Sequence, residues 1–102
     1  MPEFTKVAKT DEVAAGQAKL VEINGEEIAL FNVGGAFHAI DNTCTHAGGP
    51  LCEGEIEGNE VTCPWHGAMF DVTTGQVLGP PAARNVSRYN VRIDGSDIEV
   101  EI

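Results

Sequence analysis

Hydrophobic and polar residues alternate along much of this chain with the period of two that is typical of β-strands. In the first half, the pattern predicts strands over residues 4–9, 17–23, 27–33 and 36–40. Asn24-Gly25 and Gly34-Gly35 fall between strands, and Asn-Gly strongly indicates a two-residue hairpin because both residue types tolerate a positive φ. We expect these segments to form an antiparallel meander that leads directly to the residues after Asp41.

The second half continues the pattern in shorter pieces. Strands are predicted over residues 55–57, 60–62, 69–72 and 76–78, with turns at 58–59 and 73–75. Tyr89, Val91 and Ile93 alternate with polar residues, which predicts one buried and one solvated face. Asp94-Gly95 then closes a last hairpin onto the strand that ends the chain.

No segment has a convincing helical period over 11 residues, although residues 11–17 could form a single turn. The sequence therefore predicts an all-β protein. We expect one domain over residues 1–102, since a chain of 102 residues is long enough for one hydrophobic core. We expect a small β subdomain, from about residue 42 to about residue 81, to be inserted into a larger sheet.

Composition restricts the classes of function. Sixteen acidic residues against six Lys and Arg give a formal net charge of −10, which argues against nucleic acid or an anionic membrane as partner. This charge favours basic protein partners, although acids that only keep a small protein soluble would give the same balance. No apolar run approaches the ~20 residues of a membrane span, and the N-terminal residues lack the apolar region of a secretory signal.

The chain has three cysteines, an odd number, and two of them belong to the motif described next, so we expect no disulfide framework and a cytoplasmic location. The motif consists of Cys44-Thr45-His46 and, after sixteen intervening residues, Cys63-Pro64-Trp65-His66. Two thiolates and two imidazoles supply four nitrogen and sulfur ligands. This ligand set suits tetrahedral zinc or an iron–sulfur cluster.

The two loops read CTHAGGPL and CPWHGAMFD, and Gly79-Pro80-Pro81 follows as a third loop. Together they resemble the Rieske [2Fe-2S] signature over nearly the whole chain. The resemblance implies a Rieske fold, an antiparallel β-sandwich or barrel-like framework with a small inserted cluster-binding subdomain. It also implies one [2Fe-2S] cluster, with Cys44 and Cys63 on one iron and His46 and His66 on the other. The residues expected to surround the cluster are Gly48, Gly49, Trp65, Gly67, Pro80 and Pro81.

The same resemblance implies a low reduction potential. High-potential Rieske proteins link the two cluster loops by a disulfide, whose positions here are Gly49 and Trp65, and place serine and tyrosine hydroxyls on the sulfurs, where this chain has Ala68 and Phe70. Neither of the last two side chains can donate a hydrogen bond. We expect a potential near or below about −100 mV, in the lower part of the Rieske range.

The function implied is that of a soluble Rieske ferredoxin, similar to those of bacterial aromatic-ring-hydroxylating dioxygenase systems. Such a carrier passes single electrons from a flavin-dependent NAD(P)H reductase to a terminal oxygenase, and it is not catalytic alone. Neither a nucleotide-binding fingerprint nor a mononuclear iron site is present, since only His38 remains outside the motif. Two alternatives are the Rieske-like small subunit of a nitrite reductase and a structural zinc module. Biphenyl, naphthalene and carbazole systems use similar carriers, and the sequence does not select one.

Partner contact is expected at the outward nitrogens of His46 and His66, framed by Trp65 and Pro81, and we expect a monomer that exposes the cluster to two partners in turn. Cys52 is predicted to be a spectator thiol and His38 a structural residue. Four acids near the first loop could steer a basic partner or simply form a solvated strand face: Glu53, Glu55, Glu57 and Glu60.

Overall fold

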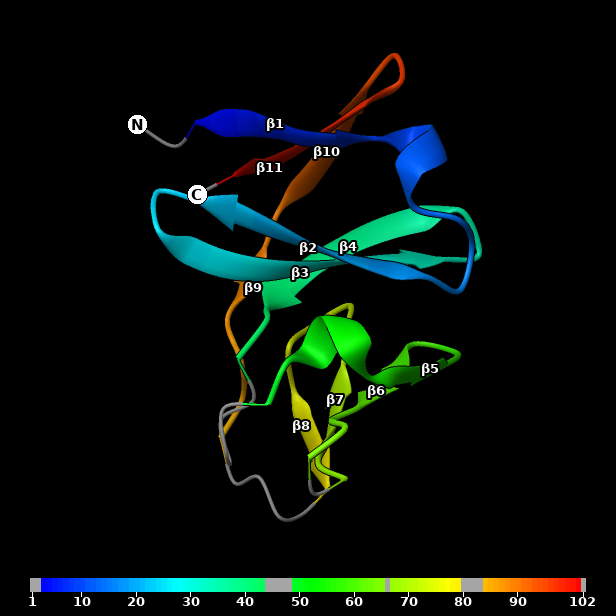
Figure 1. The fold of residues 1–102 in the computed structure, drawn as a ribbon, viewed down its shortest axis with the longest axis vertical. Helices are drawn as coiled ribbons and strands as arrows, with labels where there is room; N and C mark the ends of the chain where they lie inside the picture. Colours follow the sequence, from blue (N-terminus) through cyan, green and yellow to red (C-terminus); the bar gives the residue numbers. More distant parts are fainter. Residues whose placement is uncertain (1–2, 44–48, 66, 80–83, 102) are drawn as a thin grey trace.

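The computed structural model describes residues 3–43, 49–65, 67–79 and 84–101, and these residues form three antiparallel sheets (Figure 1). The strands are β1 (Phe4–Lys9), β2 (Ala18–Ile23), β3 (Glu26–Val33), β4 (Ala36–Asp41), β5 (Glu55–Glu57), β6 (Glu60–Thr62), β7 (Met69–Asp71), β8 (Val77–Gly79), β9 (Arg88–Tyr89), β10 (Val91–Asp94) and β11 (Asp97–Glu101). Two 3-10 helices interrupt the described strands: η1 (Thr10–Glu12) and η2 (Leu51–Glu53). The predicted all-β class is confirmed, and none of the helices in the described ranges could cross a membrane.

The sheets are stacked in three layers (Figure 1). The first sheet has the order β1-β11-β10 and the second the order β2-β3-β4-β9; we call these two the framework. The third sheet has the order β5-β6-β7-β8. We call it the cluster sheet because the second part of the motif, which begins at Cys63, lies in the connection between β6 and β7. The expected small β subdomain is therefore present as a separate sheet on one side of the framework.

The framework corrects one part of the predicted meander. Strands β2, β3 and β4 pair in sequence order, but β1 pairs with β11 and lies in the other sheet. The chain leaves β1 through η1, where the backbone N–H of Thr10 donates to the carbonyl of Ser96 at 2.8 Å. Pairing between the two ends of the chain is a non-local contact, so the alternation within β1 could not reveal it.

The local hairpin predictions are confirmed. Ile23 pairs with Glu26 across Asn24 and Gly25, whose φ values are +53° and +84°. These are the values that a tight hairpin requires at both turn positions. The turns at 58–59 and at the start of β11 likewise join paired strands.

The sheet β2-β3-β4-β9, which we call the middle sheet, lies between the other two sheets (Figure 1). It is buried on both faces, which explains the long apolar run in β3. One hydrophobic cluster fills the space between the two framework sheets: Ala8, Val13, Val21, Ile23, Ile28, Leu30, Ala39, Ile98 and Val100. A second cluster lies between the middle sheet and the cluster sheet: Ala29, Phe31, Ile40, Leu51, Val61, Cys63, Ala68, Phe70, Val72 and Val86. Alternate residues of β3 thus enter opposite cores.

The sequence predicted that Tyr89, Val91 and Ile93, in β9 and β10, share a buried face, and this prediction is wrong at one residue. Tyr89 and Val91 are partly buried, whereas Ile93 is 45% exposed. Ile93 pairs with the buried Ile98, but β10 is an edge strand of its sheet and Ile93 lies one residue before the end of that strand. The helix η2 was also missed, since three residues are too few to show a helical period.

Candidate functional site

The described residues include part of the predicted site. Cys63, Gly49, Trp65 and Gly67 are described. Six predicted site residues lie outside the described residues: Cys44, His46, Gly48, His66, Pro80 and Pro81. The geometry below is therefore that of the second loop, the ends of the first loop and the segments that lead into and out of them.

Cys63 directly follows β6 and is held in a short closed loop. Its side chain is buried, its backbone N–H donates to the carbonyl of Ala68 at 2.7 Å, and its carbonyl accepts the N–H of Gly67 at 3.2 Å. Gly67 has a φ of +77°, a conformation that favours glycine. The N–H of Gly67 thus closes the loop on the carbonyl of Cys63.

Gly49 brings the first loop against the second. A Cβ atom at Gly49 would lie 2.6 Å from the Sγ atom of Cys63 and 3.0 Å from the Cγ atom of Trp65. No side chain fits at that separation, so the bare backbone of the first loop rests on the thiol of the second. Positions 49 and 65, where a disulfide would join the loops of a high-potential Rieske protein, are in fact neighbours.

The base of the first loop is closed by Asn42, a residue that the sequence analysis did not single out. Asn42 is 4% exposed; its side-chain Oδ1 accepts the N–H of Cys52 at 2.9 Å, and its carbonyl accepts the N–H of Leu51 at 2.7 Å. Thr43 and Pro50 form a β-bridge beside it. Asn42 therefore fixes the two ends of the first loop to each other. In the sequence it is a single asparagine between Asp41 and Thr43, and nothing there indicates this role.

Two side chains near Cys63 bear on the expected potential. Ala68 and Phe70 are both fully buried in the core beneath the cluster sheet. A methyl group and a phenyl ring carry no hydroxyl, so neither position offers a side-chain hydrogen bond to a sulfur.

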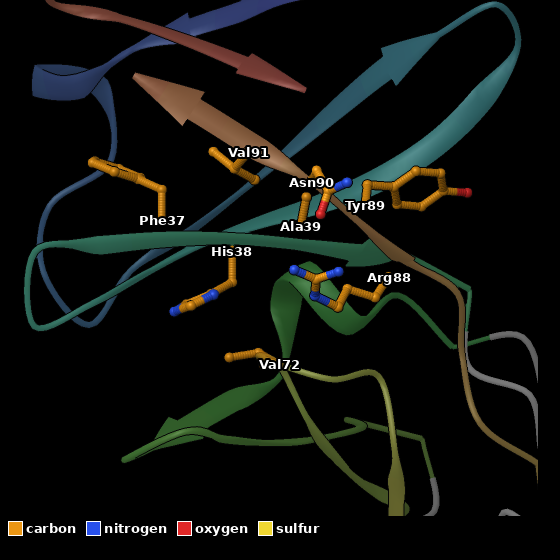
Figure 2. Close-up of a pocket in the computed structure, with 8 residues that line it drawn as sticks. All are labelled: Phe37, His38, Ala39, Val72, Arg88, Tyr89, Asn90 and Val91. Carbon is orange, nitrogen blue, oxygen red and sulfur yellow. The ribbon is translucent and has the colours of Figure 1, made fainter. Parts of the chain in front are cut away.

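A cavity of about 200 Å³ lies where β4 and β10 diverge, and Figure 2 shows His38 and Arg88 on the side of it that faces Val72. Arg88 donates from Nε to the carbonyl of Thr73 at 3.0 Å and so connects the framework to the turn of the cluster sheet. Burial lowers the pKa of His38, the positive charge of Arg88 lowers it further, and Asp71 opposes both. His38 therefore favours the neutral form at the junction of framework and cluster sheet.

Cys52 lies in η2 and is partly buried. Burial raises the pKa of its thiol, and the neighbouring carboxylate of Glu53 raises it further. The protonated thiol is a poor nucleophile and a poor metal ligand. This chemistry supports the prediction that Cys52 is a spectator.

Comparison with known families decides what this arrangement is. The model of the Rieske [2Fe-2S] domain matches residues 3–90. The chain belongs to the Rieske [2Fe-2S] domain family. Membership brings one [2Fe-2S] cluster, and the described part of the site fits it, because the sulfur of Cys63 is buried where the first loop approaches so closely that only glycine is accommodated at position 49. Zinc is not the metal of this family.

Individual relatives narrow the type of Rieske protein. The chain is 39% identical over 99 residues to the biphenyl dioxygenase ferredoxin subunit of Pseudomonas sp. (strain KKS102), covering 96% of this chain and 91% of the relative. It is 37% identical over 91 residues to the ferredoxin component of the naphthalene 1,2-dioxygenase system of Pseudomonas aeruginosa, covering 89% and 88%. The chain is thus homologous to ferredoxins, which are electron carriers and not enzymes by themselves.

Solved structures agree with this fold. The ferredoxin of carbazole 1,9a-dioxygenase from Nocardioides aromaticivorans IC177 superposes with a TM-score of 0.92 at 32% identity, over 95% of each chain. A similar ferredoxin, 30% identical with a TM-score of 0.90 over 95% of this chain and 91% of its own, has been solved in complex with the oxygenase of carbazole 1,9a-dioxygenase. A nitrite reductase small subunit from Mycobacterium tuberculosis, at 22% identity and a TM-score of 0.88 over 100% and 96%, shares the fold alone.

Proposed function

We propose that this chain carries single electrons from a flavin-dependent NAD(P)H reductase to the terminal oxygenase of an aromatic-ring-hydroxylating dioxygenase system. The cluster, when bound, supplies the site that takes up and releases each electron. The proposed ligands are Cys44 and Cys63 on one iron and His46 and His66 on the other. The observation that carries the proposal is the contact of Gly49 with the Sγ atom of Cys63, because it places the two ligand loops against each other at a buried thiol.

Anaerobic EPR after dithionite reduction, together with iron and zinc analysis, tests the proposal. We expect two irons per chain, as a [2Fe-2S] cluster requires, and a rhombic spectrum with an average g value below that of the free electron. Cys63→Ala should abolish the signal, and the matched variant Cys52→Ala should keep it. A silent spectrum with stoichiometric zinc, or an intact signal in Cys63→Ala, would contradict the ligand assignment.

Trp65 is the proposed contact for the redox partners. The Cβ and Cγ atoms of Trp65 lie against Gly49 of the first loop, yet the residue is 52% exposed. A large exposed aromatic residue is typical of the centre of a protein interface. Trp65→Ala should slow electron transfer to the oxygenase about tenfold, the loss expected for one interface residue of moderate importance. Trp65→Phe, which keeps an aromatic ring, should retain most of the rate, and both variants should keep their iron.

The proposed potential is low, near or below about −100 mV, at the lower part of the range of Rieske centres. The support is the absence of side-chain donors at Ala68 and Phe70, both of which are fully buried. Phe70→Tyr would place a phenol at the position that carries a donor in high-potential relatives. An equilibrium redox titration should give a negative value for the native chain and a higher one for Phe70→Tyr; a clearly positive native value would end this part of the proposal.

A further inference from the structure

One carboxylate joins the segment that enters the proposed cluster site to the segment that leaves it. Asp41 ends β4 and precedes the proposed ligand Cys44 by three residues, while Ser87 follows Pro81 by six residues. The Oδ1 atom of Asp41 accepts the hydroxyl of Tyr89 at 2.7 Å, and Oδ2 accepts the backbone N–H of Ser87 at 3.0 Å. The backbone N–H of Asp41 donates in turn to the carbonyl of Ser87 at 2.9 Å.

The contacts around Asp41 extend to both neighbouring loops. On one side, Asn42 closes the first loop through the backbone N–H groups of Leu51 and Cys52. On the other side, the segment that returns from the third loop is fixed to the cluster sheet, because the N–H of Val86 donates to the carbonyl of Gly75 at 2.9 Å. Asp41 is therefore the side chain that couples two segments already fixed to different parts of the site.

Tyr89 is suited to be a permanent donor in this arrangement. Burial raises the pKa of its phenol far above the ordinary value, and the hydrogen bond and negative charge of Asp41 raise it further. The phenol therefore keeps its proton throughout the neutral range. A hydrogen bond from a neutral hydroxyl to a carboxylate is shorter and stronger than one between neutral groups.

We propose that Asp41 is a positioning residue of the cluster site, which holds the first ligand loop in register with the segment that follows the third loop. The inference rests on the proposed ligand assignment, because Cys44 and His46 give the first loop its role. Asp41 acts through the backbone of the loop and is not itself a ligand. Its loss should leave the framework strands paired but allow the first loop and the return segment to shift relative to each other.

The experiment compares three variants of the cluster-loaded protein. Tyr89→Phe removes one hydrogen bond and keeps the charge of Asp41, and Asp41→Ala removes all side-chain contacts of the carboxylate. Glu99→Gln is the matched control, because Glu99 also joins two strands by accepting from Arg92, but in the framework sheet on the far side from the cluster sheet. For each variant, iron release to a chelator, the EPR g values of the reduced protein and denaturant unfolding are measured.

We expect iron release about tenfold faster in Tyr89→Phe, the factor associated with one charge-assisted hydrogen bond, and faster still in Asp41→Ala. The g values should shift in both variants, since they report the arrangement of the ligands, and should stay native in Glu99→Gln. If Tyr89→Phe and Asp41→Ala lose unfolding stability but keep native g values and native iron release, Asp41 merely joins two strands and the proposal is overturned.

A separate measurement on metal-free protein keeps this inference distinct from the ligand assignment. Amide hydrogen exchange at Leu51 and Cys52, which close the first loop through Asn42, should accelerate in Asp41→Ala and not in Glu99→Gln. Unchanged exchange would overturn the positioning role. If exchange is faster in Asp41→Ala but the unsubstituted chain binds no iron, the ligand assignment is overturned, whereas the coupling of the two segments by Asp41 stands.

Discussion

The cluster sheet and the framework obtain their stability in different ways. Strand β3 of the framework spans eight residues, whereas each strand of the cluster sheet spans three. The framework has a core of its own between its two sheets, but the buried residues of the cluster sheet pack on the middle framework sheet. Such short strands are not stable alone. The cluster sheet therefore has its core only together with the framework, whereas the framework has a second core of its own.

The largest expected effect comes from removing the ring that joins the two regions. Phe70 in β7 is fully buried against residues of the middle sheet. Phe70→Ala should lower the free energy of unfolding by about 3–5 kcal/mol and release iron from the protein that stays folded. Denaturant titration and iron analysis measure the two effects.

Ile98→Ala provides the control for Phe70→Ala within the other core. Ile98 is equally buried but belongs to the core between the framework sheets. This variant should lose about 2–5 kcal/mol of stability while the folded fraction keeps its iron and native EPR spectrum. If both variants lost iron in proportion to their stability, the two regions would form one cooperative unit and the contrast drawn above would be wrong.

The second prediction tests the contact between the ligand loops. Gly49→Ala would bring a Cβ atom to 2.6 Å from the Sγ atom of Cys63, and overpacking of this kind costs about 1–3 kcal/mol. We expect the cluster content to fall strongly because the clash is at the sulfur of a proposed ligand. Gly79→Ala is the matched control, since no heavy atom of the described residues lies within 4 Å of its added Cβ. Equal iron content in the two variants, measured by iron analysis, would show that the first loop can move away without loss of the site.

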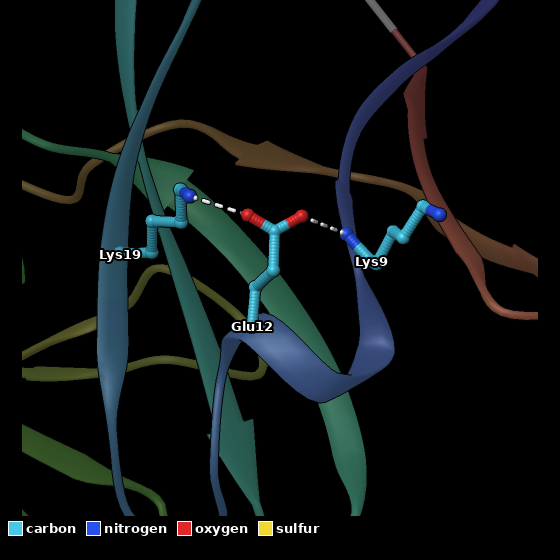
Figure 3. A network of polar contacts seen from close by, with 3 residues as sticks. All are labelled: Lys9, Glu12 and Lys19. Carbon is cyan, nitrogen blue, oxygen red and sulfur yellow. Dashed lines mark hydrogen bonds and ion pairs between the residues drawn. The ribbon is translucent and has the colours of Figure 1, made fainter.

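Charge also distinguishes the two regions. Residues 42–81 contain five Asp and Glu and no Lys or Arg. In the framework, three acids are paired with bases: Asp97 with Lys6, Glu99 with Arg92, and Glu12, which accepts from Lys19 and from the backbone of Lys9 (Figure 3). The hydrogen bond from Lys19 lowers the pKa of Glu12. Residues 42–81 thus carry acidic side chains without basic ones, whereas the rest of the chain carries eleven acids together with all six Lys and Arg.

The third prediction uses this difference in charge. Electron transfer from a basic reductase should slow about tenfold between 0.01 M and 0.15 M salt, as the Debye length falls from about 30 Å to about 8 Å. Glu55 and Glu57 are exposed on β5, the edge strand of the cluster sheet. The pair Glu55→Gln and Glu57→Gln should lower the rate at low salt and weaken its salt dependence. The control pair Glu3→Gln and Asp94→Asn, at exposed framework positions, should change neither; equal effects would indicate that only net charge matters.

The sequence predicted what depends on neighbouring residues. Asn24-Gly25 specifies its own turn, because the conformation is set by two residues, and the alternation in β11 specifies which of its side chains are buried. The cysteine and histidine motif specified the family, since four ligands of two types at fixed spacing leave few alternatives.

What the sequence did not predict depends on residues far apart in the chain. The pairing of β1 with β11 joins the two ends of the chain, and no local pattern encodes it. Asn42 was missed because its partners, Leu51 and Cys52, lie across the first loop. Gly49 was expected near the cluster on the basis of the family pattern, but its contact with Cys63 became evident only when the two loops were placed side by side.

The smallest expected effect concerns His38, at the boundary of the two regions. Burial and the charge of Arg88, from β9, lower its pKa in the folded state, while Asp71, from β7, partly opposes them. The unfolded chain therefore binds more protons near the ordinary histidine pKa of about 6.5, so this contribution to stability is complete above that pH and is lost as the pH falls below it. The loss should be below about 1 kcal/mol because the side chain is partly exposed. Unfolding titrations of metal-free protein between about pH 7 and 5 should show a shallower pH dependence for His38→Gln than for the native chain. An identical slope would mean that the surroundings of His38 relax to admit the proton, and that the junction is looser than the packing of the two sheets suggests.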